Sequence, residues 1–170
     1  MKLIVYMAMS VNGYIARTDN ATDFVSKTEW KSFKKMIGKT GNMVVGRKTY
    51  GIMKAGKEFK GLQNIRVVVV SKTGNVMLAN KKHATVTTPN DAIALLKKEK
   101  FKTALIAGGG KLNASFMKQN LVDEMYLDIE SVALGKGVPL FSDEDFFMQL
   151  KLEGVKKLSA NEVQLHYKKR

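Results

Sequence analysis

Four consecutive valines, Val67 to Val70, constrain the fold more than any other feature of this sequence. Valine is β-branched, so an unbroken run of it favours an extended strand. A strand with one face in water would alternate apolar and polar residues, whereas this run has no polar position. Such a run is typical of a strand covered on both faces, as in a parallel sheet between two layers of helices.

The rest of the chain alternates between short apolar runs, which predict strands, and stretches of helical apolar spacing. Thr88 followed by Pro89 is a typical N-cap and first turn of a helix. The predicted strands span residues 3–9, 42–45, 67–70, 84–87, 103–107 and 125–129, and the predicted helices span residues 28–37, 47–53, 89–96 and 111–118.

The last thirty residues change in character. Apolar and polar residues alternate along two segments on either side of a turn-rich stretch, which indicates an antiparallel hairpin with one face in water. The apolar positions are Met148, Leu150, Leu152, Val163, Leu165 and Tyr167. We therefore predict an α/β fold in three layers: a mainly parallel central sheet, a C-terminal antiparallel hairpin and about four helices, in one domain over residues 1–170.

The composition excludes several classes of function. With no cysteine, the chain has no thiol nucleophile, no disulfide and no cysteine zinc site. Neither histidine, His83 or His166, stands in a carboxylate-rich cluster, so we expect no metal. No apolar stretch approaches the ~20 residues of a membrane span. The apolar start at residues 3–9 is too short for a signal peptide, so we expect a cytoplasmic protein.

The net charge of +14 comes almost entirely from lysine, because only four of the 29 basic residues are arginine. One interpretation is a solvated surface, and another is a positive field that draws an anionic ligand. A nucleic-acid-binding module is a third. Aromatic residues make up only 8% of the chain and do not interleave with lysine along one strand, as a stacking platform for bases requires. We therefore regard nucleic acid as an unlikely partner.

A glycine-rich turn from Gly108 to Gly110 follows a predicted strand and opens a predicted helix at Lys111. Glycine lets backbone amides approach a ligand, and the start of a helix offers unpaired N–H groups to an anion. The spacing differs from the Rossmann fingerprint because Asn113 stands where its third glycine would be. The alternative is a purely structural turn, but three successive glycines favour phosphate contact.

A second strand-to-helix turn runs through Gly46, Arg47, Lys48 and Thr49. It resembles a P-loop incompletely, since Arg47 interrupts the motif and a strand-like stretch occupies the would-be loop. The simplest alternative is an amphipathic helix with exposed cations. Two cations at a helix start, which ordinarily prefers anions, favour an anion site instead.

Two further segments follow the carboxyl ends of predicted strands, the edge at which open α/β sheets bind ligands. Ser71 and Lys72 come directly after the valine run and place a hydroxyl and an ammonium there. Ala8, near the end of the first strand, is small enough for a flat ring to pack on the backbone. Several anion sites on one edge predict a dinucleotide, with an additional ribose phosphate at Ser71 and Lys72.

Taken in order, these motifs resemble the dihydrofolate reductase superfamily over nearly the whole chain. The motifs are Gly13-Tyr14-Ile15-Ala16, Val45-Gly46-Arg47-Lys48-Thr49-Tyr50, Val70-Ser71-Lys72-Thr73 and Ile106-Ala107-Gly108-Gly109-Gly110. Residues 121–127 and 134–141 are more similar to the reductase domain at the carboxyl end of the bifunctional deaminase–reductase of riboflavin biosynthesis. That resemblance implies NADPH as cofactor, a pyrimidine nucleotide as substrate and a possible homodimer.

The resemblance also implies roles for individual residues. It implies that Ala8 and Ile15 contact the nicotinamide and that Ser71 and Lys72 hold the 2′-phosphate. The pyrophosphate and neighbouring phosphates would be bound by Gly46, Arg47, Lys48, Thr49, Gly108, Gly109, Gly110, Lys111 and Leu112. Substrate would be bound by Trp30, Phe33 and Asn113.

Dihydrofolate reductases carry a carboxylate on their first helix. Counting back from Gly46 in this sequence, the corresponding position is Trp30, and Glu29 precedes it by one residue. Glu29 and Asp128 are therefore the candidate catalytic carboxylates. We expect an NADPH-dependent reductase of a pyrimidine or pterin-type ring, of the riboflavin type, in which the protein orients the ring and supplies a proton. Reduction of 7,8-dihydrofolate is the alternative within this class, and binding of the nucleotide without turnover is another possibility.

Overall fold

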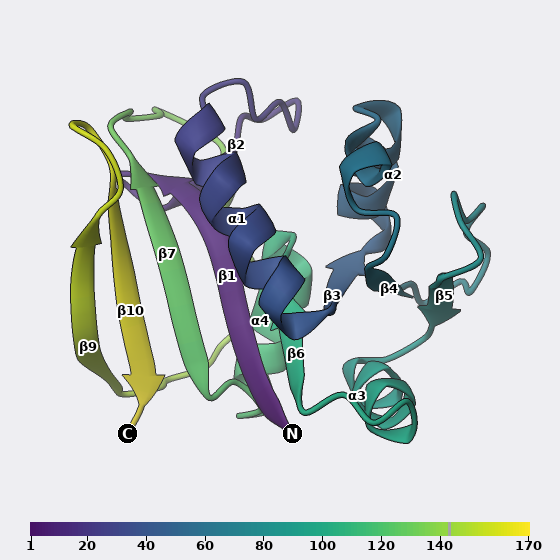
Figure 1. The fold of residues 1–170 in the computed structure, drawn as a ribbon. Helices are drawn as coiled ribbons and strands as arrows, with labels where there is room; N and C mark the ends of the chain where they lie inside the picture. The colour runs from purple at the N-terminus through teal and green to yellow at the C-terminus, as the bar shows by residue number, and fades with distance from the viewer. Residues whose placement is uncertain (143) are drawn as a thin grey trace.

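A computed structural model describes residues 1–142 and 144–170, whose chain folds around one eight-stranded sheet (Figure 1). The strand order is β5-β4-β3-β6-β1-β7-β10-β9. The strands of this sheet are β1 (Lys2–Ser10), β3 (Asn42–Gly46), β4 (Arg66–Val70), β5 (His83–Val86), β6 (Thr103–Ile106), β7 (Glu124–Glu130), β9 (Leu150–Lys157) and β10 (Val163–Lys169). The helices are α1 (Lys27–Thr40), α2 (Arg47–Ala55), α3 (Pro89–Lys98) and α4 (Gly110–Lys118), with a 3₁₀ turn, η1, at Glu58–Gly61.

The first six strands of the sheet order pair in parallel, and β10 pairs antiparallel with both β7 and β9. A mainly parallel sheet with a C-terminal antiparallel hairpin and four α-helices confirms the predicted fold class. Because β1, β3, β4 and β6 run in the same direction, their carboxyl ends meet at one edge. The candidate functional site described below lies at this edge.

The valine run of β4 is buried on both faces, as expected. Val67 and Val69 pack in one core with α1 and α2, and Val68 packs in a second core with α3 and α4. All three are 0% exposed. Figure 1 shows α1 in front of β1 and β6, with α4 behind them. The helices thus form the two outer layers of a three-layer molecule.

A second, small sheet was not predicted. It pairs β2 (Tyr14–Ala16) antiparallel with β8 (Val138–Pro139). Gly137 next to it has no room for a side chain, because a Cβ there would overlap the Ala16 carbonyl oxygen. The pairing ties the segment after β1 to the segment after β7. In the described part of the chain, no helix is both long and apolar enough to cross a membrane.

Candidate functional site

A cavity of about 760 Å³ lies along the carboxyl ends of β3, β4 and β6 and beside the second half of β1. Four of the sequence segments singled out above contribute to its wall. The predicted site residues that line it are Ala8, Ile15, Glu29, Trp30, Phe33, Gly46, Arg47, Lys48, Thr49, Lys72, Gly109, Gly110, Lys111 and Leu112.

The N-termini of α2 and α4 both meet this cavity, and both are uncapped. Their N-cap residues are Gly46 and Gly109, with no side-chain cap among the described residues and no acidic residue in either first turn. By contrast, α1 is capped by Ser26 and α3 by a Thr88–Asp91 capping box. A helix start that lacks such partners leaves N–H groups available for an anion.

The glycines at this edge allow the two turns to touch. The Gly46 N–H donates to the Gly108 carbonyl oxygen at 2.8 Å, which ties the end of β3 to the turn after β6. Gly108 has a φ of 85°, a conformation that favours glycine. At Gly110 a Cβ would lie 2.5 Å from the Ser142 hydroxyl and would overlap the Pro139 carbonyl oxygen. Glycine is therefore required where α4 begins.

Four cations line the cavity, all of them near these strand ends: Arg47, Lys48, Lys72 and Lys111. In the described part of the chain, no carboxylate forms an ion pair with Arg47, Lys48 or Lys72. Two uncapped helix starts and several cations in one cavity are suited to a ligand with more than one phosphate group. The residues present therefore fit a dinucleotide.

The other half of the cavity is aromatic and acidic. Phe33 on α1 packs against Trp30 and against Tyr6 of β1, with ring centroids 5.5 Å apart in both pairs. Glu29, at the start of the same helix, is 6% exposed and lines the cavity. Among the described residues, none donates a hydrogen bond to its carboxyl.

The electrostatics of this half favour protonated carboxyl groups. Burial raises the pKa of Glu29 to about 8, and the nearby charges of Asp128 and Glu130 raise it further toward that value. Burial also raises the pKa of Glu58 in η1, which lines the cavity as well. A carboxyl that holds its proton at neutral pH is suited to general acid chemistry.

Asp128 does not reach the cavity. It is 1% exposed and accepts hydrogen bonds from the Tyr6 hydroxyl at 2.5 Å and from the Gln164 amide at 2.8 Å. Tyr6 lines the cavity, and Ser32 of α1 lies 2.8 Å from its hydroxyl. Asp128 thus contacts the Tyr6 hydroxyl from behind the cavity wall, and the catalytic role expected for it stays a prediction.

Three other predicted residues lie outside the cavity wall. Asn113 is 0% exposed and donates to the Leu140 carbonyl oxygen, and its contact with substrate stays a prediction. The Ser71 hydroxyl is 3.2 Å from that of Thr73, and Ser71 does not line the cavity. Gly108 is the third residue outside the wall. Its carbonyl oxygen accepts the hydrogen bond from Gly46 described above.

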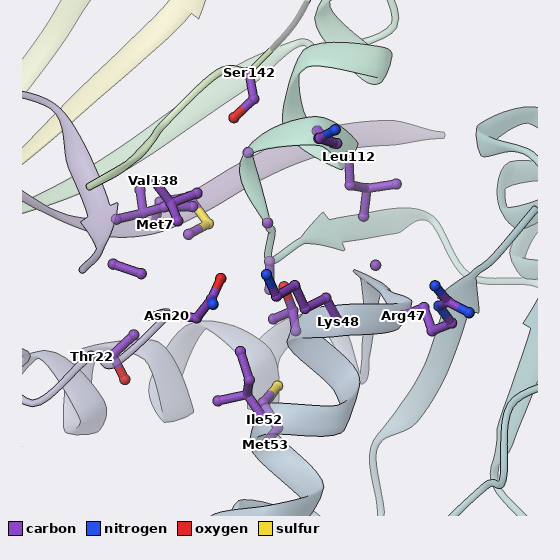
Figure 2. A pocket seen from close by; sticks show the side chains of 18 of the residues that line it. Met7, Asn20, Thr22, Arg47, Lys48, Ile52, Met53, Leu112, Val138 and Ser142 are labelled. Carbon is purple, nitrogen blue, oxygen red and sulfur yellow. The ribbon is translucent and has the colours of Figure 1, made fainter. Parts of the chain in front are cut away.

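Sequence reasoning missed several residues of the wall. Ile52 and Met53 continue the face of α2 that begins at Thr49, at helical spacing that could have indicated them. Glu58 lies in a 3₁₀ turn that has no apolar period. In Figure 2, Asn20 and Thr22 lie on one side of the view and Arg47 on the other, with Lys48 between them.

The fold is a three-layer α/β domain with a cavity at the carboxyl edge of its parallel sheet, and the lining of that cavity suits a ligand with several phosphate groups. The model of the RibD C-terminal domain family matches residues 1–164, so the chain belongs to this family. This confirms the resemblance to the reductase domain of riboflavin biosynthesis.

Several individual proteins are similar to the chain. The Bacillus subtilis protein YwjB, itself uncharacterized, is 30% identical over 98% of this chain and 97% of its own length. A Shewanella sp. PV-4 crystal structure, named for a riboflavin biosynthesis protein, has a TM-score of 0.83 at 25% identity and covers 100% and 99% of the two chains. A Thermotoga maritima deaminase/5-amino-6-(5-phosphoribosylamino)uracil reductase shares the fold, with a TM-score of 0.75, 15% identity and coverage of 99% and 56%.

Proposed function

We propose that the protein is an NADPH-dependent reductase of a flat pyrimidine or pterin-type heterocycle. The observation that carries this proposal is the division of one cavity into two halves. One half joins two uncapped helix starts with four cations, and the other joins an aromatic wall with the buried acid Glu29. A cofactor and a ring substrate both fit within such a space.

The nucleotide half supplies contacts for each part of NADPH. The amides at the starts of α2 and α4, with Arg47 and Lys48, bind the pyrophosphate. Lys72, after β4, binds the 2′-phosphate that distinguishes NADPH from NADH. Ala8 and Ile15, which line the cavity from β1 and β2, contact the nicotinamide. When bound, the cofactor supplies a hydride.

The proposed reaction adds a hydride to the carbon of a C=N or C=O bond and a proton to its nitrogen or oxygen, while NADPH is oxidised to NADP⁺. Trp30 and Phe33 form the wall against which the ring packs, and Asp128 fixes the Tyr6 hydroxyl next to Phe33. Glu29 holds the proton at neutral pH because its pKa is about 8. The protein thus orients the ring and supplies the proton.

Family membership supports the same conclusion. The name of the Thermotoga maritima relative describes reduction of a substituted uracil. The buried carboxyl on α1 favours a second candidate substrate, 7,8-dihydrofolate, because a carboxyl can pair with the amino-substituted edge of a pterin.

Turnover can be measured as loss of NADPH absorbance with a panel of ring substrates that includes 5-amino-6-(5-phosphoribosylamino)uracil, its dephosphorylated form and 7,8-dihydrofolate. We expect at least one ring of the panel to be reduced, with Glu29→Gln lowering kcat at least tenfold, since glutamine cannot release a proton. NADPH oxidation that is equally fast without any ring substrate would contradict the proposal.

A further inference from the structure

One buried hydroxyl beside the start of α4 has no hydrogen-bond partner in the described part of the chain. Ser142 is 8% exposed and lines the cavity. Its Oγ lies 2.5 Å from the point that a Cβ on Gly110, the first residue of α4, would occupy. No described group donates to this oxygen or accepts from it. A hydroxyl withdrawn from water without a partner is unfavourable, so this one is suited to a ligand in the cavity.

The segment that carries Ser142 is held in place from two sides. The Ser142 N–H donates to the Gly110 carbonyl oxygen at 3.3 Å, and the side-chain amide of Asn113 donates to the Leu140 carbonyl oxygen at 3.1 Å. On the other side, the Leu140 N–H donates to the Gly13 carbonyl oxygen at 2.9 Å. The hydroxyl is therefore positioned before any ligand binds, which lowers the entropic cost of a contact with it.

The Ser142 hydroxyl and the start of α4 face the same part of the cavity. Figure 2 shows Ser142 above the turn that leads into Leu112, with its oxygen directed toward that turn. The N-cap of α4 is Gly109, which has no side chain, so among the described residues no side chain caps the first N–H groups of the helix. Backbone N–H groups and one hydroxyl, all of which can donate, thus converge on one point.

We infer that Ser142 is a further binding residue for the nucleotide, and that its hydroxyl donates a hydrogen bond to the pyrophosphate oxygen held at the start of α4. This inference rests on the proposed function and adds to it a contact from the segment that follows β8. Ser142 belongs to none of the sequence motifs described above. Only the packing of its segment on α4 brings it to the site.

The chemistry of this contact predicts which ligands depend on it. A hydroxyl that donates to an ionised oxygen forms a charge-assisted hydrogen bond, which is stronger than a neutral one. NADPH, NADH and ADP-ribose share the pyrophosphate, whereas only NADPH carries the 2′-phosphate and ADP-ribose lacks the nicotinamide. Loss of the Ser142 hydroxyl should therefore weaken all three ligands by a similar factor, whereas loss of the Lys72 charge should weaken NADPH selectively.

Calorimetric titrations of the full chain test this with Ser142→Ala and the matched control Ser115→Ala. Each substitution removes one serine hydroxyl. The Ser115 hydroxyl, on α4 itself, donates to the Leu112 carbonyl oxygen at 2.7 Å and is thus already engaged within the helix. Wild type and both variants are titrated with NADPH, NADH, ADP-ribose and inorganic pyrophosphate, and their melting temperatures are measured without ligand.

We expect Ser142→Ala to weaken the binding of NADPH, NADH and ADP-ribose by about tenfold or more, with similar factors for all three, and to weaken inorganic pyrophosphate as well. Its melting temperature should not fall, because the lost hydroxyl has no partner among the described residues. Ser115→Ala should change each affinity by less than about twofold.

Unchanged affinities in Ser142→Ala would overturn the inference. A loss for NADPH and NADH that spares ADP-ribose would also overturn it, because the hydroxyl would then serve the nicotinamide, and so would equal losses in Ser115→Ala. Failure of the wild type to bind NADPH and NADH would instead contradict the proposed function. In that case inorganic pyrophosphate decides: weaker binding to Ser142→Ala than to wild type supports the contact, and equal or absent binding overturns it.

Discussion

Glu29 combines the features of the proposed proton donor at the scale of a single residue. It is buried, it lines the cavity, and its pKa is raised by burial and by Asp128 and Glu130. Counting along the sequence placed the family's acid at Trp30, one residue away, which is about 100° around a helix. The structure places both side chains in the cavity wall, so the count alone could not choose between them.

The pKa of Glu29 predicts a pH dependence of stability. Because the folded protein binds this proton more tightly than the unfolded chain, its contribution is favourable below pH 4.5 and is lost as the pH rises to about 8. Glu29→Gln, which cannot ionise, removes that loss. We expect the free energy of unfolding of the variant, relative to wild type, to rise by about 2–4 kcal/mol between pH 5 and pH 8 in urea melts.

The groups that face Glu29 and titrate with it are Asp128, Glu130, Glu58 and Glu162. These four carboxyl groups remain in the variant. The difference in unfolding free energy between variant and wild type therefore reports only the titration of Glu29 and its coupling to the four groups. Glu153→Gln is the control, because Lys151 holds the pKa of this exposed carboxyl below its usual value. Parallel stability curves for wild type and Glu29→Gln over this range would show that the carboxyl is not buried as described.

Lys72 predicts a choice between cofactors. Removal of its charge in Lys72→Met should weaken NADPH binding about three- to tenfold, with less than a twofold effect on NADH, because only NADPH carries a 2′-phosphate. Ser71→Ala is the matched control: its hydroxyl is engaged with Thr73, so we expect no change for either nucleotide. Equal losses for NADPH and NADH in Lys72→Met, in fluorescence titrations, would refute this role.

At the scale of elements, the turns that lead into helices were more predictable than the small sheet. Gly46 and Gly109 were recognisable as helix starts because strand, glycine and helix pattern follow one another directly. The pairing of β2 with β8 joins segments of three and two residues that lie far apart in the sequence. Such short strands show no alternation, so periodicity cannot indicate them.

The start of α4 predicts a large effect from one methyl group. Gly110→Ala would place a Cβ against the Pro139 carbonyl oxygen and the Ser142 hydroxyl, and backbone must move to accept it. We expect a loss of about 2–3 kcal/mol of stability together with weaker NADPH binding. The matched control is Gly51→Ala within α2, where nothing lies within 4 Å and helix propensity should add up to about 1 kcal/mol. Thermal melts that rank the two variants in the opposite order would contradict the packing described here.

At the scale of the whole molecule, the valine run made the layered architecture predictable, since each valine of its buried centre belongs to one of two cores. The net charge of +14 was less informative about the location of the site. Four lining cations have a proposed ligand, while the acidic half of the cavity assembles from α1 and η1, which only the tertiary fold brings together.

We propose that the protein forms a homodimer through its outer strand, β9. β9 ends the sheet, and Leu152 and Val155 on it are 51% and 61% exposed. Exposed apolar side chains on an edge strand favour contact with another chain. Val155→Lys should shift the species seen by light scattering from dimer to monomer, while Met77→Lys, at a more exposed apolar residue before β5, should not. A wild type that is monomeric at tens of micromolar would contradict the proposal.

The measurement that tests the central claim most directly is a calorimetric titration of the protein with NADPH at low salt. The two uncapped helix starts and their cations predict one site per chain, micromolar or tighter affinity, and weaker binding as ionic strength rises. Absence of binding at millimolar NADPH would contradict a nucleotide-dependent reductase.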